Sequence, residues 1–211
     1  MVLDPPLAHP IIGRLTVIGI GLIGSSILRA AEARGLAGTL VAYDGSEAVR
    51  ERAEALDIAD LVATTPAQAV EGADIIILCV PVGAMGAVAE AIAPHVKAGA
   101  IVSDVGSVKG AVVSALRAHL PESVHIVPGH PVAGTEYSGP DAGFATLFKN
   151  RWSILTPPEG TDPAAVATLS GLWSAMGANV ETMTPEHHDL VLAITSHVPH
   201  LIAYNIVGTA A

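Results

Sequence analysis

Cysteine is almost absent from this sequence of 211 residues, in which Cys79 is the only one. One cysteine cannot build an internal disulfide framework, which excludes a small disulfide-stabilised secreted domain. Cys79 stands within an apolar run, so we expect a small buried side chain there rather than a reactive thiol. A single thiol also fits a reducing compartment, and we expect the protein in the cytoplasm.

Basic residues are few as well. Lysine and arginine total 10 against 20 aspartate and glutamate residues, which gives a formal net charge of −10. This balance argues against nucleic acid and anionic membranes as partners, although local positive groups could still hold a small anionic substrate. The segment Met1–Pro10 also lacks the basic start and the apolar run of a signal peptide.

Charged residues disappear altogether from Leu190 to Ala211. This stretch is long enough to span a bilayer. It nevertheless contains polar residues such as Ser196, His200 and Asn205, and no basic flank follows it. We therefore predict a helix that is buried against other protein, with a membrane span as the alternative.

Apolar residues make up 51% of the sequence and occur in short runs that alternate with helical patterns. Continuous apolar strands separated by helices predict a parallel sheet covered on both faces, which is a doubly wound α/β fold. The predicted strands are Arg14–Ile18, Leu40–Tyr43, Ile75–Val80, Ile101–Asp104, His125–Val127, Ser153–Leu155 and Val180–Met183. The predicted helices are Leu22–Arg34, Ser46–Leu56, Val82–Ile92, Val108–His119 and Pro163–Met176.

A change of pattern after Met183 predicts a domain boundary. Thr184 and Pro185 have the character of an N-cap and a first helical residue. We expect one long helix from there onward, with a kink at Pro199. Residues 1–183 would then form the α/β domain, and residues 184–211 would begin an all-α domain.

The glycine-rich segment Gly19–Gly24 (GIGLIG) follows the first predicted strand and opens a helix, as a dinucleotide-binding G-x-G-x-x-G motif requires. Gly19 permits the tight turn, Gly21 lets the backbone approach a pyrophosphate, and Gly24 allows the helix to pack closely on the strand. Backbone N–H groups at the start of the helix, including those of Leu22 and Ile23, would face the phosphates. A purely structural glycine turn is the alternative.

Two further segments fit the same nucleotide site. Asp44 ends the second strand, 20 residues after Gly24, where a carboxylate accepts hydrogen bonds from ribose hydroxyls and repels a 2′-phosphate. It favours NAD over NADP, with a helix-capping role as the alternative. Val80 and Pro81 end the third main strand and would pack on adenine or nicotinamide, and a simple strand-to-helix turn at this point is compatible with that role.

The segment Asp104–Gly110 (DVGSVKG) lies at the next strand end. Ser107 would hydrogen-bond a substrate beside the nicotinamide, and it could also cap the helix that follows. Lys109 could attract a substrate carboxylate, but a lysine in a first helical turn is more often a solvated surface charge.

His130 stands between Gly129 and Pro131, directly after the fifth strand. We expect a rigid turn that presents this imidazole at the ligand edge of the sheet. A histidine with a pKa near neutrality can accept the proton of an alcohol while a hydride is removed. Glu136 either orients this histidine or closes a turn.

Four segments together resemble the successive motifs of the prephenate/arogenate (cyclohexadienyl) dehydrogenases, the TyrA family of tyrosine biosynthesis. They are Gly19–Gly24 with Asp44, then Asp104–Gly110, then Gly129–Gly139 (GHPVAGTEYSG), then Ser196–His200 (SHVPH). The resemblance implies a Rossmann-type NAD-binding domain and a helical dimerisation domain. It also implies an enzyme that decarboxylates prephenate, arogenate or both by oxidation with NAD, in a cytoplasmic homodimer.

The resemblance also assigns roles to individual residues. His130 would be the catalytic histidine, Ser107 would contact the same ring hydroxyl and the nicotinamide, and Ser196, His200 and Glu136 would bind substrate. The family's helical domain supplies an arginine for the ring carboxylate, but the last arginine here is Arg151. We therefore expect the helical domain to be cut short.

Three other interpretations stay open. Histidines 187, 188, 197 and 200 could bind a metal, but no cysteine or carboxylate completes a convincing set, so we expect none. A β-hydroxyacid or imine reductase would need a lysine base on the helical domain, and no lysine follows Lys149. An NAD-binding sensor without turnover would explain the missing arginine.

Overall fold

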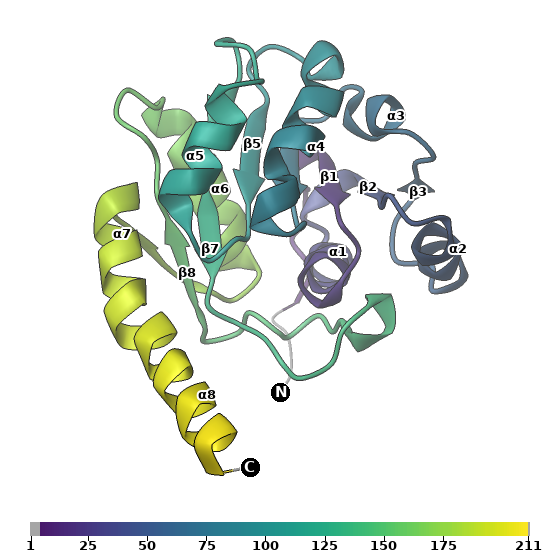
Figure 1. Cartoon of the computed structure of the whole chain (residues 1–211). Helices are drawn as coiled ribbons and strands as arrows, with labels where there is room; N and C mark the ends of the chain where they lie inside the picture. Colours follow the sequence, from purple (N-terminus) through teal and green to yellow (C-terminus); the bar gives the residue numbers. More distant parts are fainter. Residues whose placement is uncertain (1–4, 211) are drawn as a thin grey trace.

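The computed structural model describes residues 5–210, so the expectations for Met1–Asp4 and for Ala211 lie outside it. Its main sheet has six parallel strands in the order β3-β2-β1-β4-β5-β6, and a second sheet has three strands in the order β7-β8-β9 (Figure 1). The six strands are β1 Ile12–Ile18, β2 Ala37–Tyr43, β3 Leu61–Val62, β4 Ile75–Leu78, β5 Ile101–Asp104 and β6 His125–Ile126. This strand order confirms the doubly wound prediction.

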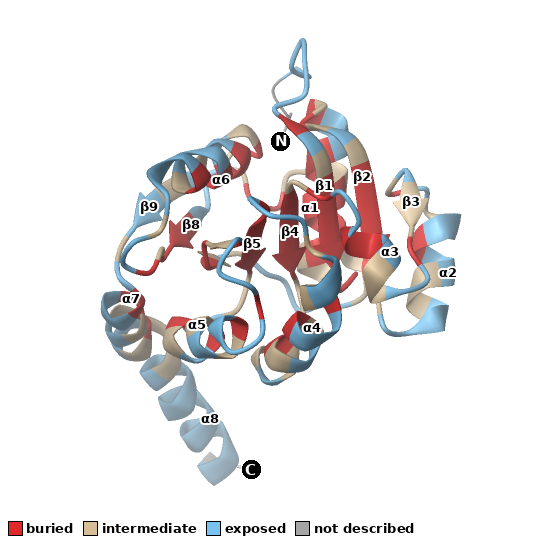
Figure 2. Cartoon of the chain, turned by 90° about the horizontal axis from the view of Figure 1, so that it is seen from above, coloured by how far each residue is buried: buried red, intermediate tan, exposed pale blue. Residues whose placement is uncertain are grey.

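Helices cover both faces of the main sheet. The helices are α1 Leu22–Arg34, α2 Glu47–Ala55, α3 Pro66–Val70, α4 Met85–Ile92, α5 Lys109–Arg117, α6 Pro163–Ala175, α7 Pro185–Leu192 and α8 Val198–Ala210. Short 3-10 turns lie at Val82–Ala84, Ala93–His95 and Pro140–Ala142. Figure 2 shows α4 and α5 on one side of the buried strands and α6 on the other.

Alternate residues of each central strand enter two separate apolar clusters. Val17 of β1 joins a cluster with α1 and α6, whereas its neighbour Ile18 joins a cluster with α3, α4 and α5. Ile77 and Leu78 of β4 divide in the same way. Because successive side chains of a strand point to opposite faces, a strand with both faces covered is mainly apolar on both sides. This is why these strands could be predicted from continuous apolar runs.

The prediction placed all strands in a single sheet, but the last two predicted strands lie outside the main sheet. β8 Trp152–Leu155 and β9 Asn179–Thr182 pair with each other in parallel, and β7 Gly129–Pro131 pairs antiparallel with β8. α6 packs on this second sheet. Periodicity predicts that a segment is extended, but it carries no information on which strand will be its neighbour.

Three elements were not predicted, namely β3, α3 and β7. β3 has only two residues and α3 only five, so neither shows a hydrophobic period. The local capping signals were more informative. Gly35 ends α1 in the left-handed conformation with a φ of 61°. The Thr184 side chain accepts a hydrogen bond from the His187 N–H at the start of α7, with Pro185 as the first helical residue.

The C-terminal helix is interrupted one turn before the expected kink. A π-helical turn at Ala193–His197 separates α7 from α8, and the N–H of Val198 donates to the carbonyl of Ala193. Pro199 has no N–H to donate to the turn before it, which favours such an irregularity. The prediction of a break near Pro199 was therefore correct in kind, but it placed the break about one turn too late in the chain.

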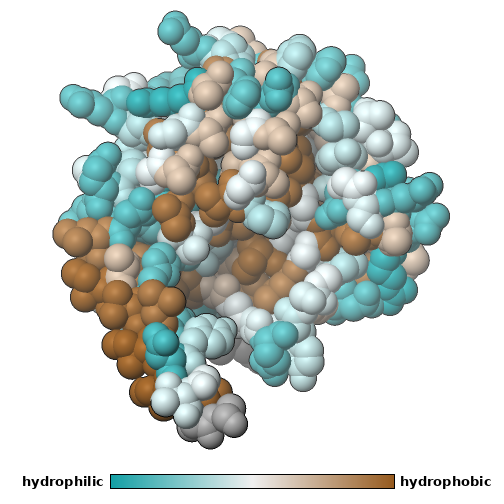
Figure 3. All heavy atoms as spheres, viewed as in Figure 1, coloured by the Kyte–Doolittle hydropathy of each residue, from teal (hydrophilic) through white to brown (hydrophobic). Residues whose placement is uncertain are grey.

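The C-terminal helix is apolar and largely exposed, so this chain does not cover it, and its burial against other protein stays a prediction. Figure 3 shows the apolar surface along it. The exposed residues that we call the C-terminal apolar face are Leu190, Ile194, Val198, Leu201, Ile202, Tyr204, Ile206 and Val207. By length and composition alone, the helical stretch Pro185–Thr209 could also cross a membrane.

Candidate active site

The glycine turn between β1 and α1 has the geometry expected of each glycine. Gly19 has a φ of 97°, and a Cβ there would lie 2.4 Å from the carbonyl oxygen of Cys79. A Cβ at Gly24 would lie 2.0 Å from the carbonyl oxygen of Gly19. A Cβ at Gly21 would meet nothing within 4 Å, so the space beside that backbone is open. Two of the glycines are thus required by the fold itself, while Gly21 leaves room for a ligand.

The start of α1 offers hydrogen-bond donors to such a ligand. Its N-cap is Gly21, which has no side chain to satisfy the first N–H groups. The N–H groups of Leu22 and Ile23 belong to this first turn, where the helix dipole favours negative charge. The turn therefore has the form of a phosphate site.

A cavity of 330 Å³ opens beside this turn. It lies between β1 and β4, where the strand order of the sheet changes direction, because the strands after β1 are added on one side and those from β4 onward on the other. Ligands of open α/β sheets bind at this topological switch point. The cavity is lined by Ile18, Gly19, Tyr43, Asp44, Gly45, Pro66, Val80, Ala84, Ala87, Val88 and Ala91. Its walls are mainly apolar, with the Asp44 carboxyl as the acidic group. Pro81 follows Val80 as the N-cap of the next turn. This lining fits an adenosine group.

The carboxylate of Asp44 is fixed by hydrogen bonds from backbone N–H groups of two neighbouring loops. It accepts hydrogen bonds from the N–H of Ile20 and the N–H of Ser46, both at 2.9 Å. Arg50 donates to the carbonyl oxygen of Asp44 at 2.7 Å and lies over the Tyr43 ring, 5.9 Å from its centroid. The sequence motif does not include Arg50, because a residue six positions later is brought back only by the turn of α2.

His130 lies on the short strand β7 rather than in a turn as predicted. Gly129, His130 and Pro131 pair with Leu155, Ile154 and Ser153 of β8. A proline is tolerated here because β7 is an edge strand. Burial, with smaller contributions from the charges of nearby groups, lowers the pKa of His130 to about 4. The imidazole is therefore neutral at physiological pH and can accept a proton.

Two residues that the sequence did not assign to the site are linked to this histidine, His188 by direct contact and Asp189 through His188. The His188 Nε2 lies 2.9 Å from the Nδ1 of His130, and the His188 Nδ1 lies 2.9 Å from Oδ1 of Asp189. The His188 side chain is fully buried. Glu136 is exposed in the loop after β7, and both interpretations of it, orienting His130 or closing a turn, stay predictions.

The expected surface position of Lys109 is wrong. Its side chain is fully buried and forms an ion pair of 2.5 Å with the equally buried Asp104. Lys109 also donates to the carbonyl of Gly129 at 2.6 Å, and Asp104 accepts from the N–H groups of Gly106 and Gly129. Burial lowers the pKa of Lys109 and raises that of Asp104, against their mutual attraction. The pair connects the segment that carries Ser107 with the strand that carries His130.

The alternative interpretation of Ser107, as the cap of α5, is wrong. The N-cap is Val108, and the N–H groups of Lys109 and Gly110 donate instead to the carboxylate of Asp189, at 2.7 and 2.9 Å. Ser107 itself is exposed at the end of β5. Its hydroxyl is therefore accessible to a substrate at the carboxyl end of the sheet.

The motif at the C-terminal helix lies partly near this centre. Ser196 is half-buried, whereas His200 is exposed and its Nδ1 hydrogen-bonds the Ser196 carbonyl oxygen at 2.8 Å. The neighbouring His197 contributes to the lowered pKa of His130, so it lies within electrostatic reach of that imidazole. Within residues 5–210, no group of three or more His, Cys, Asp or Glu side chains is arranged to hold a metal ion.

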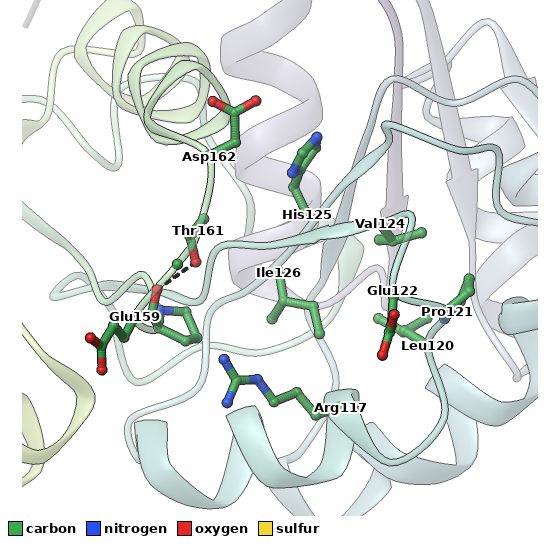
Figure 4. A pocket seen from close by; sticks show the side chains of 12 residues that line it. Arg117, Leu120, Pro121, Glu122, Val124, His125, Ile126, Glu159, Thr161 and Asp162 are labelled. Atoms are coloured by element: carbon green, nitrogen blue, oxygen red, sulfur yellow. Dashed lines mark hydrogen bonds between the residues drawn. The ribbon is translucent and has the colours of Figure 1, made fainter.

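A second cavity of 360 Å³ contains none of the predicted site residues (Figure 4). It lies between the end of α5, β6 and the loop before α6, and its lining includes Arg117, His125 and Glu159. Instead, the predicted site residues lie at the carboxyl ends of strands of the main sheet. The glycine turn follows β1, Asp44 follows β2 and Ser107 follows β5, while His130 lies beside the end of β5, because its neighbour Gly129 hydrogen-bonds Asp104. This arrangement is that of a Rossmann-type nucleotide-binding fold with a neutral histidine at the same end of the sheet.

Comparison with known proteins agrees with this class. The family model described as "Prephenate dehydrogenase, nucleotide-binding domain" matches residues 27–182, and "Prephenate dehydrogenase, dimerization domain" matches residues 184–211. The chain belongs to the prephenate dehydrogenase family. It is 50% identical to a cyclohexadienyl dehydrogenase of Zymomonas mobilis and 34% identical to a prephenate dehydrogenase of Bacillus subtilis, in both cases over 92% of this chain.

Solved structures show the same relationship. The structure of prephenate dehydrogenase from A. aeolicus in complex with hydroxyphenyl propionate and NAD+ has a TM-score of 0.86 and 32% identity. Arogenate dehydrogenase from Synechocystis has a TM-score of 0.84 and 31% identity. Each comparison covers 93% of this chain and 68% of the other. The chain spans 66% of the Zymomonas relative and 52% of the Bacillus relative.

Proposed function

We propose that the protein catalyses the NAD-dependent oxidative decarboxylation of prephenate, arogenate or both, as a step of tyrosine biosynthesis. The observation that carries this proposal is the position of His130. The imidazole is neutral and lies beside the end of β5, because the neighbouring Gly129 hydrogen-bonds Asp104 and Lys109, so it is at the same end of the fold as the glycine turn and the exposed Ser107. Membership of the prephenate dehydrogenase family supports the choice of reaction.

The residues of the nucleotide site fit NAD. Gly19, Gly21 and Gly24 form a turn that accepts a pyrophosphate at the start of α1, and Asp44 would accept hydrogen bonds from the ribose hydroxyls. Val80 and Pro81 would contact the bases. When bound, NAD supplies the acceptor for a hydride. The carboxylate of Asp44 would repel the 2′-phosphate of NADP, so we propose NAD as the preferred cofactor.

His130 would act on the ring hydroxyl of the substrate. The imidazole accepts a hydrogen bond from this hydroxyl, and then its proton, as the carbon that bears it loses a hydride and becomes a carbonyl. Ser107 would contact the same hydroxyl. The ring carboxylate then leaves as CO₂, and aromatisation makes this loss strongly favourable. The protein therefore mainly positions the reactants and polarises one hydroxyl.

The C-terminal helix would complete the site and the assembly. Ser196 and His200 are four residues apart and so share a helix face, from which we propose that they bind substrate, together with Glu136 of the loop after β7. The C-terminal apolar face needs a partner, and the match to a dimerization domain favours a second copy of the protein over a membrane. We place this homodimer in the cytoplasm.

The test is NADH formation by the purified protein with NAD, with prephenate and arogenate offered in parallel and NADP as the cofactor control. Turnover of either acid supports the proposal and identifies the substrate. Measurable NAD binding by a dimer that converts neither acid would contradict it. That result would favour an NAD-binding sensor.

A further inference from the structure

Three side chains form a linear hydrogen-bonded chain that ends at the proposed base. His130 lies on β7, while His188 and Asp189 lie on α7, which packs against α5 (Figure 2). The two imidazole rings are 5.1 Å apart between centroids and inclined by 69°. The two hydrogen bonds of the chain are both 2.9 Å long, and His188 at its centre is fully buried.

The acidic end of this chain is fixed by the start of α5. The carboxylate of Asp189 accepts hydrogen bonds from the N–H groups of Lys109 and Gly110. Burial opposes the ionisation of Asp189, but these hydrogen bonds, together with the contact to His188, outweigh it and lower the pKa of its carboxyl. A helix N-terminus also favours an anion. Asp189 is therefore an ionised group that can only accept hydrogen bonds.

Asp189, the acceptor at one end, determines where each proton of the three hydrogen-bonded side chains lies. Because Asp189 can only accept, the Nδ1 of His188 must carry hydrogen. Burial lowers the pKa of His188, so its ring is neutral and its Nε2 has a free lone pair. That lone pair accepts a hydrogen bond from the Nδ1–H of His130. The Nε2 of the neutral His130 is then left without hydrogen, as a base requires.

We propose that His188 and Asp189 are positioning residues that hold His130 in the Nδ1–H tautomer and share the proton it receives from the substrate. The inference rests on the proposed function. As the Nε2 of His130 takes the hydroxyl proton, its Nδ1 proton passes to the Nε2 of His188. The resulting imidazolium then lies next to the carboxylate of Asp189. One proton enters the chain and no electron moves along it.

Two substitutions of His188 test this proposal. His188→Phe removes the acceptor for the Nδ1–H of His130, whereas His188→Gln keeps an acceptor oxygen at that position. His187→Phe is the matched control, because His187 is an exposed neighbour on the same helix. The first readout is the ¹⁵N NMR spectrum of histidine-labelled protein, with the His130 signals assigned through His130→Asn.

We expect His130 in the Nδ1–H tautomer in the unaltered protein, in His188→Gln and in the control, and a shift to the Nε2–H tautomer in His188→Phe. The second readout is kcat/KM, which should fall by about 100-fold in His188→Phe, recover in part in His188→Gln and stay unchanged in the control. NAD affinity should be equal in all four proteins, which verifies their fold. A merely structural role for His188 would give no tautomer shift and no recovery with glutamine.

An Nε2–H tautomer of His130 in the unaltered protein would overturn the proposal. An unchanged kcat/KM in His188→Phe would overturn it as well, while the proposed function would stand. If the unaltered protein converts neither acid, the proposed function fails, yet the NMR spectra still decide whether His188 sets the tautomer of His130.

Discussion

Lys109 and Asp104 form an ion pair in which neither side chain is exposed to solvent. The pair lies between the end of β5 and β7, and its hydrogen bonds reach Gly106 on one side and Gly129 on the other. Ser107 follows Gly106, and His130 follows Gly129. The two proposed reacting side chains are thus held relative to each other by a buried contact that touches neither of them.

Lys109→Met should destabilise the protein by about 3–5 kcal/mol, because it leaves the buried carboxyl of Asp104 without its partner. The measurement is the free energy of unfolding in denaturant. Lys97→Met is the control, since Lys97 pairs with Asp74 at the surface, where an ion pair contributes about 1 kcal/mol or less. Equal effects of the two substitutions would show that the buried pair is no more important than the exposed one.

His130→Asn should lower kcat by about 10²–10⁴ and leave the affinity for NAD nearly intact, because it removes a general base but no group of the nucleotide site. Steady-state kinetics and a direct NAD titration measure the two effects separately. Unchanged turnover would remove His130 from the mechanism.

The acid limb of kcat/KM should lie near pH 4 rather than near the ordinary histidine value. His130 acts as a base only when neutral, and its pKa of about 4 keeps it neutral above that pH. Activity should therefore be retained as the pH falls through about 6.5 and be lost as it falls through the lowered pKa. The measurement is the pH dependence of kcat/KM across this range, which reports the pKa of groups in the free enzyme. Circular dichroism verifies that the protein stays folded. A half-maximal value near pH 6.5 would contradict the burial-lowered pKa.

Two glycines of the same turn should respond to alanine in opposite ways. Gly24→Ala brings a methyl group into the Gly19 carbonyl and should cost about 1–3 kcal/mol of stability. Gly21→Ala meets no protein atom, so it should change stability by about 1 kcal/mol or less. It should nevertheless weaken NAD binding about tenfold or more, because the methyl group takes the space of the pyrophosphate. Thermal unfolding and NAD titration of both variants decide this, and equal NAD affinity in Gly21→Ala and the parent would refute the placement.

Leu201→Asp should dissociate the proposed dimer. Leu201 belongs to the C-terminal apolar face and is 61% exposed, so a charge there disturbs no core of the chain itself but opposes burial against a second copy. Sedimentation velocity over a range of concentrations measures the change. Leu7→Asp is the control, an exposed apolar residue of the N-terminal segment. A dimer that is equally stable in both variants would place the interface elsewhere.

The sequence by itself determined the features that depend on neighbours in the chain. The strand β4 (Ile75–Leu78) is apolar at every position, so it had to be covered on both faces. Gly35 and Thr184 act through hydrogen bonds within their own helix ends. The glycine turn needs only a strand before it and a helix after it. Such signals are local, and a local pattern is visible without the fold.

Only the tertiary structure decided which distant residues meet. Lys109 looks like a surface lysine in a first helical turn, until Asp104 and the backbone of β7 enclose it. His188 belongs to a polar first turn of α7, until the packing of α7 on α5 brings it to His130. β8 lies outside the main sheet because it pairs with β7 and β9. Each of these contacts joins residues whose separation in the chain carries no periodic signal, so the folded arrangement alone determines them.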